Sequence, residues 1–354
     1  MAIDPDVQLL LDGINGRIDG LTRPTGVFYV DPGQSIQNAL NAAKSADGGD
    51  VVLALGTHTI NRPLEMLNQR VRLKGPGMTG CWIVAGPSWS GGQMIRNWPG
   101  SDLFPSSNST NFYPQISGII LNLGGQDNLT GIGLVHPNER GLIEQISMDN
   151  PGVGCVGIDI GRAVNAMDGC TIRDIVLYGT GWEHELRAAH GTDLRVSGWT
   201  TAPSLHTGSP FELNNGISQA SFTDMHVESW VDAADTALFR LTNSRGFVLR
   251  DSLVSMNVPY SRPIVRATNS NGSGYNVSNP VIADLLILGY DNLTATNLIE
   301  DESQGYDIRN LATADYTPTY IDRYDGFEFK WREPDWSGLA DVANPRWVSF
   351  RGAG

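Results

Sequence analysis

Six short phrases between residues 115 and 290 share one pattern: an apolar residue, any residue, then Asp, Gly or Gln, and then a second apolar run. They occupy residues 116–121, 143–148, 172–177, 222–227, 249–254 and 282–287. Their third positions follow one another after 27, 29, 50, 27 and 33 residues, and the gap of 50 corresponds to about two units. Such a period is typical of repeat architectures, in which each unit buries its apolar face against the next.

Each phrase is rich in Ile, Val, Leu and Phe and is too short for a helix, which indicates a strand. Strict alternation fails at the third position, because Ile172 and Asp174 would share one face while Ile175 and Leu177 also require the interior. A bend at Asp174 resolves the conflict, since Asp and Gly tolerate positive φ. We therefore predict an all-β fold, a right-handed parallel β-helix of about seven turns. The alternative is a β-sandwich, whose strands would recur every 8 to 12 residues or so without the longer period.

The composition limits the partners of the chain. The formal net charge is −14 over 354 residues, which argues against nucleic acid. No apolar run is long enough to cross a membrane, and Asp4 and Asp6 stand where a secretory signal would carry bases. We expect neither membrane insertion nor a signal peptide.

Three cysteines, Cys81, Cys155 and Cys170, have no spacing typical of a metal site. We expect three reduced thiols buried inside the coil. No metal and no cofactor are predicted.

The first 24 residues predict a helix that associates with copies of itself or docks on a partner. Five apolar residues are spaced 4, 3, 4 and 3 positions apart, as in a coiled-coil seam: Val7, Leu11, Ile14, Ile18 and Leu21. A helix this short, with three glycines, is marginal alone. The alternative is a lone amphipathic helix that lies on its own domain.

A second helix is predicted near residues 33–46. Asp31 is the expected cap, Pro32 suits the first turn, and Gln34 stands where a capping box requires it. Strands at residues 51–55 and 56–60 follow. A helix here would cover the open end of the coil, where backbone and apolar side chains are otherwise exposed.

The run from Val30 through Asp-Pro-Gly-Gln-Ser-Ile-Gln, Gly48-Gly49 and Gly56-Thr-His-Thr-Ile to Gly77 resembles the start of the pectate-lyase-like β-helix family. That start is widespread in bacteriophage tailspikes and minor tail proteins and in polysaccharide-cleaving enzymes. With the repeats, the resemblance covers about residues 27–300. In this body (25–300) we expect loop insertions near residues 76–115 and 179–216.

The resemblance to phage tail proteins implies a location in the virion tail, synthesis in the host cytoplasm, and a homotrimer that contacts other virion tail proteins. It also implies bacterial surface polysaccharide as the ligand. Residues 301–354 are crowded with aromatic side chains and predict a C-terminal cap or small β module. These aromatics would bind sugar or a neighbouring subunit, or else plug the end of the coil.

The expected insertion at residues 179–216 holds the first candidate site. Glu183 and Glu185 form an acid pair that could cleave a glycan, and Trp182 and Trp199 could stack on sugar rings. The alternative is a solvated loop packed on the coil or on an adjacent subunit.

A second candidate site lies at residues 224–235. His226 and Glu228 alternate on one strand and so share a face, and Trp230 could form a sugar platform. Glu228 is the candidate catalytic group there; a hydrogen-bond network at the edge of the turn is the alternative.

Other charged residues follow the repeat. We interpret the acids at the third positions, Asp174, Asp224, Asp251 and Asp284, as a ladder of turn residues. Four arginines could steady a sugar carboxylate: Arg173, Arg187, Arg195 and Arg250.

The sequence thus favours a phage tail spike or minor tail protein that recognises a host cell-surface glycan. A polysaccharide depolymerase, either lyase or glycoside hydrolase, on the same scaffold is one alternative. A purely structural virion appendage is the other.

Overall fold

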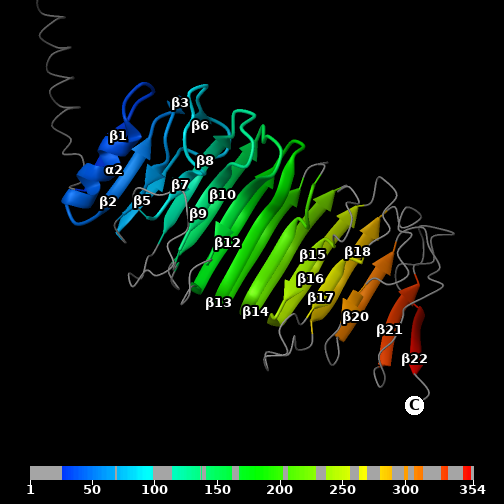
Figure 1. Ribbon diagram of the computed structural model, residues 1–354. Coiled ribbons are helices and arrows are strands. Elements are labelled where there is room, and N and C mark those ends of the chain that lie inside the picture. The colour runs from blue at the N-terminus through cyan, green and yellow to red at the C-terminus, as the bar shows by residue number, and fades with distance from the viewer. Residues whose placement is uncertain are drawn as a thin grey trace, which may run out of the picture.

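The structure is a computed structural model in which parallel strands stack into a rod (Figure 1). It describes residues 26–67, 70–98, 114–135, 137, 141–161, 167–201, 206–228, 237–255, 263–268, 280–288, 299–301, 307–313, 328–333 and 346–351. Nearly all the regular structure of this part is parallel β, wound into a coil whose turns stack along the rod. The predicted parallel β-helix is confirmed.

The first stack of strands runs along the rod and carries the repeated phrase. Its members, in order of pairing, are β1 (Val27–Val30), β2 (Gly49–Leu53), β5 (Val71–Lys74), β8 (Gln115–Asn122), β10 (Leu142–Asp149), β12 (Met167–Leu177), the second halves of β13 (Trp182–Thr201) and β14 (Phe211–Glu228), then β16 (Arg245–Ser255), β18 (Val281–Leu288) and β20 (Asp307–Thr313). In the early turns the part after the bend is a separate strand, β3 (Gly56–Ile60) and then β6 (Cys81–Ala85), which pairs with the end of β8.

The second stack closes each turn. It consists of β4 (Leu64–Glu65), β7 (Gln93–Arg96), β9 (Thr130–Leu134), β11 (Cys155–Ile160), the first halves of β13 and β14, β15 (Phe239–Thr242), β17 (Val265–Thr268) and β19 (Ile299–Asp301). Long β13 and β14 each belong to both stacks, because each turns a corner within one strand. His190 (φ 54°) and Asn215 (φ 55°) stand at these corners.

The predicted bend is present in seven consecutive turns. The residue at the bend has a φ between 51° and 67° at Gly118, Gln145, Asp174, Gly198, Asp224, Asp251 and Asp284. L-residues adopt this region with difficulty, and Gly, Asn and Asp do so most readily. The bend therefore lets residues on both of its sides point inward.

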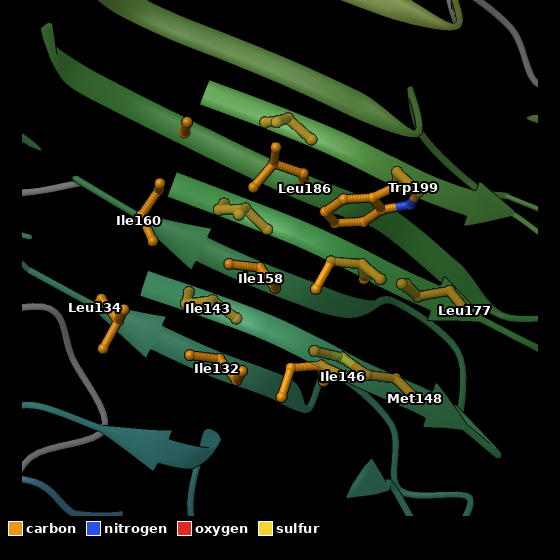
Figure 2. Close-up of a cluster of buried hydrophobic side chains, with 14 of the residues drawn as sticks. Ile132, Leu134, Ile143, Ile146, Met148, Ile158, Ile160, Leu177, Leu186 and Trp199 are labelled. Atoms are coloured by element: carbon orange, nitrogen blue, oxygen red, sulfur yellow. The ribbon is translucent and has the colours of Figure 1, made fainter. Parts of the chain in front are cut away.

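Apolar side chains from both stacks fill one interior, as Figure 2 shows for the middle of the rod. Stacked positions repeat the same chemistry: Ile132, Ile158 and Leu186 lie above one another in the second stack. Farther along, aromatic rings take over, and Phe211 stacks on Phe239 with ring centroids 4.8 Å apart. Each fully buried side chain of this size contributes roughly 1.5–3 kcal/mol relative to an exposed one.

The helix α2 (Ile36–Ser45) covers the N-terminal end of the coil, as predicted, and buries Ile36, Leu40 and Ala43. The prediction of Asp31 as its cap is wrong. Ser35 caps the helix by accepting a hydrogen bond from the Asn38 backbone N–H, and its position directly before Ile36 suits that role. Gln34 instead accepts from the Asp31 N–H at 2.9 Å.

The prediction of a loop insertion at residues 179–216 is wrong, because β13 forms a regular turn of the coil there. Its bend lies at Gly198, and Trp199 stacks on Ile175 of the preceding turn. Within the insertion expected near residues 76–115, β6 and β7 are likewise parts of regular turns. Residues 99–113 lie outside the described residues.

At the C-terminal end, β21 (Glu328–Glu333) pairs in parallel with β20, and β22 (Arg346–Arg351) pairs with β21 in antiparallel fashion. The proposed N-terminal helix over residues 1–24, with Val7, Leu11, Ile14, Ile18 and Leu21, lies outside the described residues. Of the helices within the described ranges, none combines the length and apolar character needed to span a bilayer.

The three thiols behave as expected from the sequence. Cys81, Cys155 and Cys170 are free and buried in the interior. Burial raises the pKa of Cys81 to about 11 and that of Cys170 to about 12, so neither forms a reactive thiolate near neutral pH.

Candidate polysaccharide site

A column of charged residues occupies outward-facing positions of the second stack, and Asp159 within it is fully buried. Asp159, Arg187, Glu212 and Arg240 are partners in register on four successive strands, with inward-facing apolar residues on either side. The Arg187 guanidinium donates to Asp159 Oδ2 at 2.6 Å. Arg240 Nη1 lies 3.9 Å from Glu212 Oε1. Opposite charges therefore alternate over these four strands.

His184 joins this column to a second carboxylate. Its Nδ1 lies 2.6 Å from the Ser209 backbone oxygen. Its Nε2 lies 3.1 Å from Glu212 Oε2 and 3.8 Å from Glu183 Oε1. Glu183 also lies 3.9 Å from Arg187 Nη1. One imidazole is therefore shared by two carboxylates.

The contacts to His184 fix how far apart the two carboxylates can be. Because both oxygens lie close to the same nitrogen, Glu183 Oε1 and Glu212 Oε2 are separated by no more than about 7 Å. The carboxyl pairs of glycoside hydrolases fall at about 5–9.5 Å. The Glu183 side chain is 44% exposed, whereas that of Glu212 is 11% exposed, so one carboxylate faces solvent and the other lies at the base of the site.

The local fold explains how Glu183 reaches this position. Cys155 pairs with Trp182 and Val156 pairs with His184, so Glu183 is an extra residue in β13. A β-bulge of this kind re-aims a side chain. Gly208 makes room on the next turn: a Cβ there would lie 2.8 Å from the Glu183 carbonyl oxygen and 3.1 Å from His184 Cε1.

Burial sets the electrostatics of His184. Removal from water lowers the pKa of the imidazole, and Arg187 lowers it further. Glu212, the hydrogen bond to Ser209 and Glu183 act in the opposite direction, but the desolvation of the ring outweighs them.

Glu185 is not part of this outer surface. It is fully buried and points into the coil, where its carboxylate accepts from Trp199 Nε1 at 2.8 Å and from Thr201 Oγ1 at 2.7 Å. His206 Nε2 lies 2.9 Å from its other oxygen. A catalytic role for Glu185 is inconsistent with this burial.

The two tryptophans predicted to bind sugar are also interior residues. Trp182 and Trp199 are completely buried, so neither indole face can stack on a ligand. Trp199 packs edge-on against Phe211, with centroids 5.4 Å apart. Both indoles were expected on a surface loop. They lie in the core because β13, which carries them, is a turn of the coil.

In the second predicted site, His226 and Glu228 do share one face of a strand, as expected. The His226 and Glu228 side chains are both partly exposed on β14, with Nε2 and Oε1 3.0 Å apart. Trp230 lies outside the described residues. Among the described residues, His226 has Thr200 and Leu253 as its partners in register and Glu228 has Ser255, and none of these three is charged.

The repeated charges of the first stack form a simpler array. Arg173 and Arg250 occupy the same column, separated by Ser197 and Thr223. Arg173 donates twice to Glu144 Oε2. The acids at the bends are exposed and have positive φ, as expected for turn residues. Arg195 pairs with Asp193 two residues away.

Sequence reasoning singled out Glu183 but missed Glu212, His184, Asp159 and Arg240 as parts of one site. A usable signal was present: Asp159, Arg187, Glu212 and Arg240 follow one another after 28, 25 and 28 residues, close to the repeat period. In the described ranges no group of His, Cys, Asp and Glu side chains is arranged to hold a metal ion.

Comparisons with known proteins find no matching family model and no matching curated protein. Among solved structures, ORF18 of Geobacillus virus E2 is 12% identical, with a TM-score of 0.41, over 86% of this chain and 63% of that protein. A tailspike protein of E. coli bacteriophage HK620 is 12% identical, with a TM-score of 0.46, over 82% of this chain and 61% of that protein. The A-module of a mannuronan C-5 epimerase from Azotobacter vinelandii is 16% identical, with a TM-score of 0.37, over 84% of this chain and 97% of the module.

A phage tailspike, a second viral protein and a polysaccharide-modifying enzyme are thus structural neighbours of this chain at low identity. The chain spans less than two thirds of the length of either phage protein. At these identities and TM-scores the likeness concerns the fold alone, and the function has to be argued from the site.

Proposed function

We propose that this protein is a tail spike or minor tail protein of a bacteriophage and binds polysaccharide of the bacterial surface along the outer face of its second stack. The observation that carries the binding proposal is the convergence of Glu183, Glu212, His184 and Arg187 on one side of the rod. Sugar hydroxyls both donate and accept hydrogen bonds, and this set supplies acceptors and donors together. The rod offers a straight surface on which a linear polymer can lie across several turns.

Binding can be tested with polysaccharides purified from bacterial capsule and from lipopolysaccharide, by titration calorimetry with the full chain. We expect one of these polymers to bind, and Glu183→Ala to weaken that binding. Glu228→Ala is the matched control, because Glu228 is a partly exposed carboxylate beside a histidine on another face. Absence of binding to every surface polymer would instead favour a purely structural appendage.

The assembly belongs to the same proposal. We expect a homotrimer joined through the apolar seam over residues 1–24, which also docks on other virion tail proteins. Sedimentation equilibrium of the full chain should give three times its mass. Leu11→Lys together with Ile18→Lys should reduce this to the mass of one chain, since both residues belong to the seam.

A second candidate function is hydrolysis of the bound polysaccharide. The separation of at most about 7 Å between the Glu183 and Glu212 carboxylates favours it, because that range includes the spacing of about 5–5.5 Å between the acid and the nucleophile of retaining glycoside hydrolases. Release of new reducing ends from the bound polymer would support it. Glu183→Gln should abolish that release, since an amide is neither a base nor a nucleophile here.

A further inference from the structure

The N-terminal end of the rod, where α2 lies (Figure 1), holds a cavity far from the His184 group. Its volume is about 840 Å³, within the range of roughly 300–1,000 Å³ that is usual for small-molecule sites. One wall is the N-terminal half of α2 with the residues before it. The other wall is the turn from β3 to β4, together with residues 90 and 91.

The cavity lies where the second stack begins with a short strand. β4 has only two residues and pairs with β7 along one edge. At its other edge the Gln37 side chain takes the place of a strand: its Oε1 accepts from the Glu65 backbone N–H at 2.8 Å, and its Nε2 donates to the Glu65 backbone oxygen at 3.3 Å. Nε2 also donates to Asn41 Oδ1 at 3.0 Å. These bonds fix α2 beside β4 and leave the space between α2 and the preceding turn open.

The base of the cavity is a buried ion pair. Arg96 is 5% exposed, and its Nη2 donates to Glu65 Oε1 at 2.6 Å. The two residues are also partners in register on β7 and β4. Their opposite charges compensate each other, so the base is polar and rigid without a net charge.

The rest of the polar lining differs from this base because the protein does not use it. Four exposed side chains make no hydrogen bond or ion pair to any described residue: Thr59, Asn61, Arg62 and Ser90. Gly86 on the next turn makes room for two of them, since a Cβ there would lie 2.2 Å from Asn61 Oδ1 and 2.9 Å from Thr59 Cγ2. An amide, two hydroxyls and a guanidinium thus line one cavity with their hydrogen-bonding capacity available to a ligand.

We propose that this cavity is a second saccharide site, which binds a short segment of sugar through its hydroxyl groups. Amide and hydroxyl side chains both donate and accept hydrogen bonds, as sugar hydroxyls do, and Arg62 adds donors. Hydrogen bonds already hold the wall at Gln37 and the base at Arg96, so little ordering of the protein opposes binding. The inference rests on the proposed function for its choice of ligand, bacterial surface polysaccharide.

The cavity is separate from the charged column. Gly133 is the partner in register of both Arg96, at the base of the cavity, and Asp159, the first residue of the column. A Cβ at Gly133 would lie 3.0 Å from Trp98 Cη2, so the indole packs over this position. Trp98 therefore stands between the two surfaces, and each should bind a short oligosaccharide independently of the other.

Titration calorimetry of the full chain with short oligosaccharides, prepared by partial acid hydrolysis of capsular polysaccharide and of lipopolysaccharide, gives the number of sites. We expect two equivalents per chain. Asn61→Ala together with Arg62→Ala should remove one equivalent, and Glu183→Ala should remove the other. Asn38→Ala is the matched control and should keep both, because Asn38 is an exposed amide of α2 outside the cavity lining.

The outcomes separate this site from the proposed function. Retention of all binding in the double variant would overturn the second site, and a loss confined to Glu183→Ala would leave the proposed function intact. A loss confined to the double variant would support the cavity and count against the charged column. Absence of binding to both preparations would overturn both proposals.

Salt gives the mode of recognition. A sugar hydroxyl carries no net charge, so added sodium chloride should leave the affinity of the cavity nearly unchanged. A steep fall in affinity with salt would overturn hydroxyl recognition and indicate an anion bound by Arg62.

Discussion

The bend column of the first stack and the charged column of the second stack run side by side along one rod, but they differ in how the sequence builds them. At the bend every turn requires a residue with positive φ, so Gly, Gln or Asp recurs there from Gly118 to Asp284. In the second stack the aligned residues change from turn to turn, from Asp159 to Arg187 to Glu212 to Arg240.

This contrast separates residues that hold the coil from residues free to take up a function. A solenoid tolerates any outward side chain that leaves the ladder of backbone hydrogen bonds intact, whereas its bends and interior accept few residue types. The turn at β13 and β14 departs most from the repeat, both inside, at Glu185, and outside, at Glu183 and His184. The variants below test whether the buried Glu185 network and the outer Glu183–His184 group contribute to stability and function independently of each other.

The largest effect is expected inside the coil. Glu185→Ala removes the acceptor for Trp199 and Thr201 and the partner of His206, all of which are buried. Each buried polar group left without its partner costs about 1–3 kcal/mol, so the free energy of unfolding in urea should fall by about 3 kcal/mol or more. Glu183→Ala, two residues away, is the control and should cost about 1 kcal/mol or less, because its ion pairs are long and partly exposed. Similar losses for both variants would contradict the division between interior and surface.

The bend column offers a second, smaller effect. Gly118→Asp introduces the residue that most other turns use, yet we expect a loss of about 1–3 kcal/mol in unfolding free energy. The reason is local: a Cβ at Gly118 would lie 2.6 Å from the Gly75 carbonyl oxygen. Asp251→Gly is the reverse change at an exposed bend and should cost about 1 kcal/mol at most. Equal tolerance of both changes would show that the bend residues are interchangeable.

Most of the fold could be predicted because the bend is a local property. An apolar phrase interrupted by Asp or Gly identifies a strand and its bend without knowledge of distant contacts. The turn in β13 escaped this reasoning because Thr201 occupies the position of Leu177 and Val227 in the neighbouring turns. Thr201 donates a hydrogen bond to Glu185, a role that requires a polar residue at a position that is apolar in the neighbouring turns. The buried network therefore makes the repeat harder to recognise in this turn.

The site was less predictable because it depends on register between turns. Glu183 stood out beside His184, but Glu212 comes 29 residues later, and only the pairing of β13 with β14 brings the two together. The bulge that turns Glu183 outward and Glu185 inward is also invisible in the sequence. Alternation along an ordinary strand would have put both acids on one face.

The change of unfolding free energy with pH should be smaller than the effects of these substitutions and should come from His184, beside the charged column. His184 has a lowered pKa in the folded protein, so the unfolded chain binds more protons just below the ordinary histidine range of about 6.5. The stability that His184 contributes is complete above that range and is lost as the pH falls toward the pKa of the folded state. His184→Gln should flatten this part of the curve of unfolding free energy against pH. A loss of stability on raising the pH through the same window would contradict a buried neutral imidazole.

The smallest effect is expected on the other face of β14, where His226 and Glu228 form a contact much like that of His184 and Glu212. The two pairs have nearly equal distances, 3.0 Å and 3.1 Å, but the first is partly exposed and the second is largely buried. Water screens an exposed pair, so Glu228→Gln should change the unfolding free energy by about 0–1 kcal/mol and leave polysaccharide binding unaltered. Glu212→Gln, with the same change of charge, should alter cleavage strongly. If Glu228→Gln instead weakened binding or cleavage, the working face of the rod would be the first stack, and the charged column of the second stack would only be holding turns together.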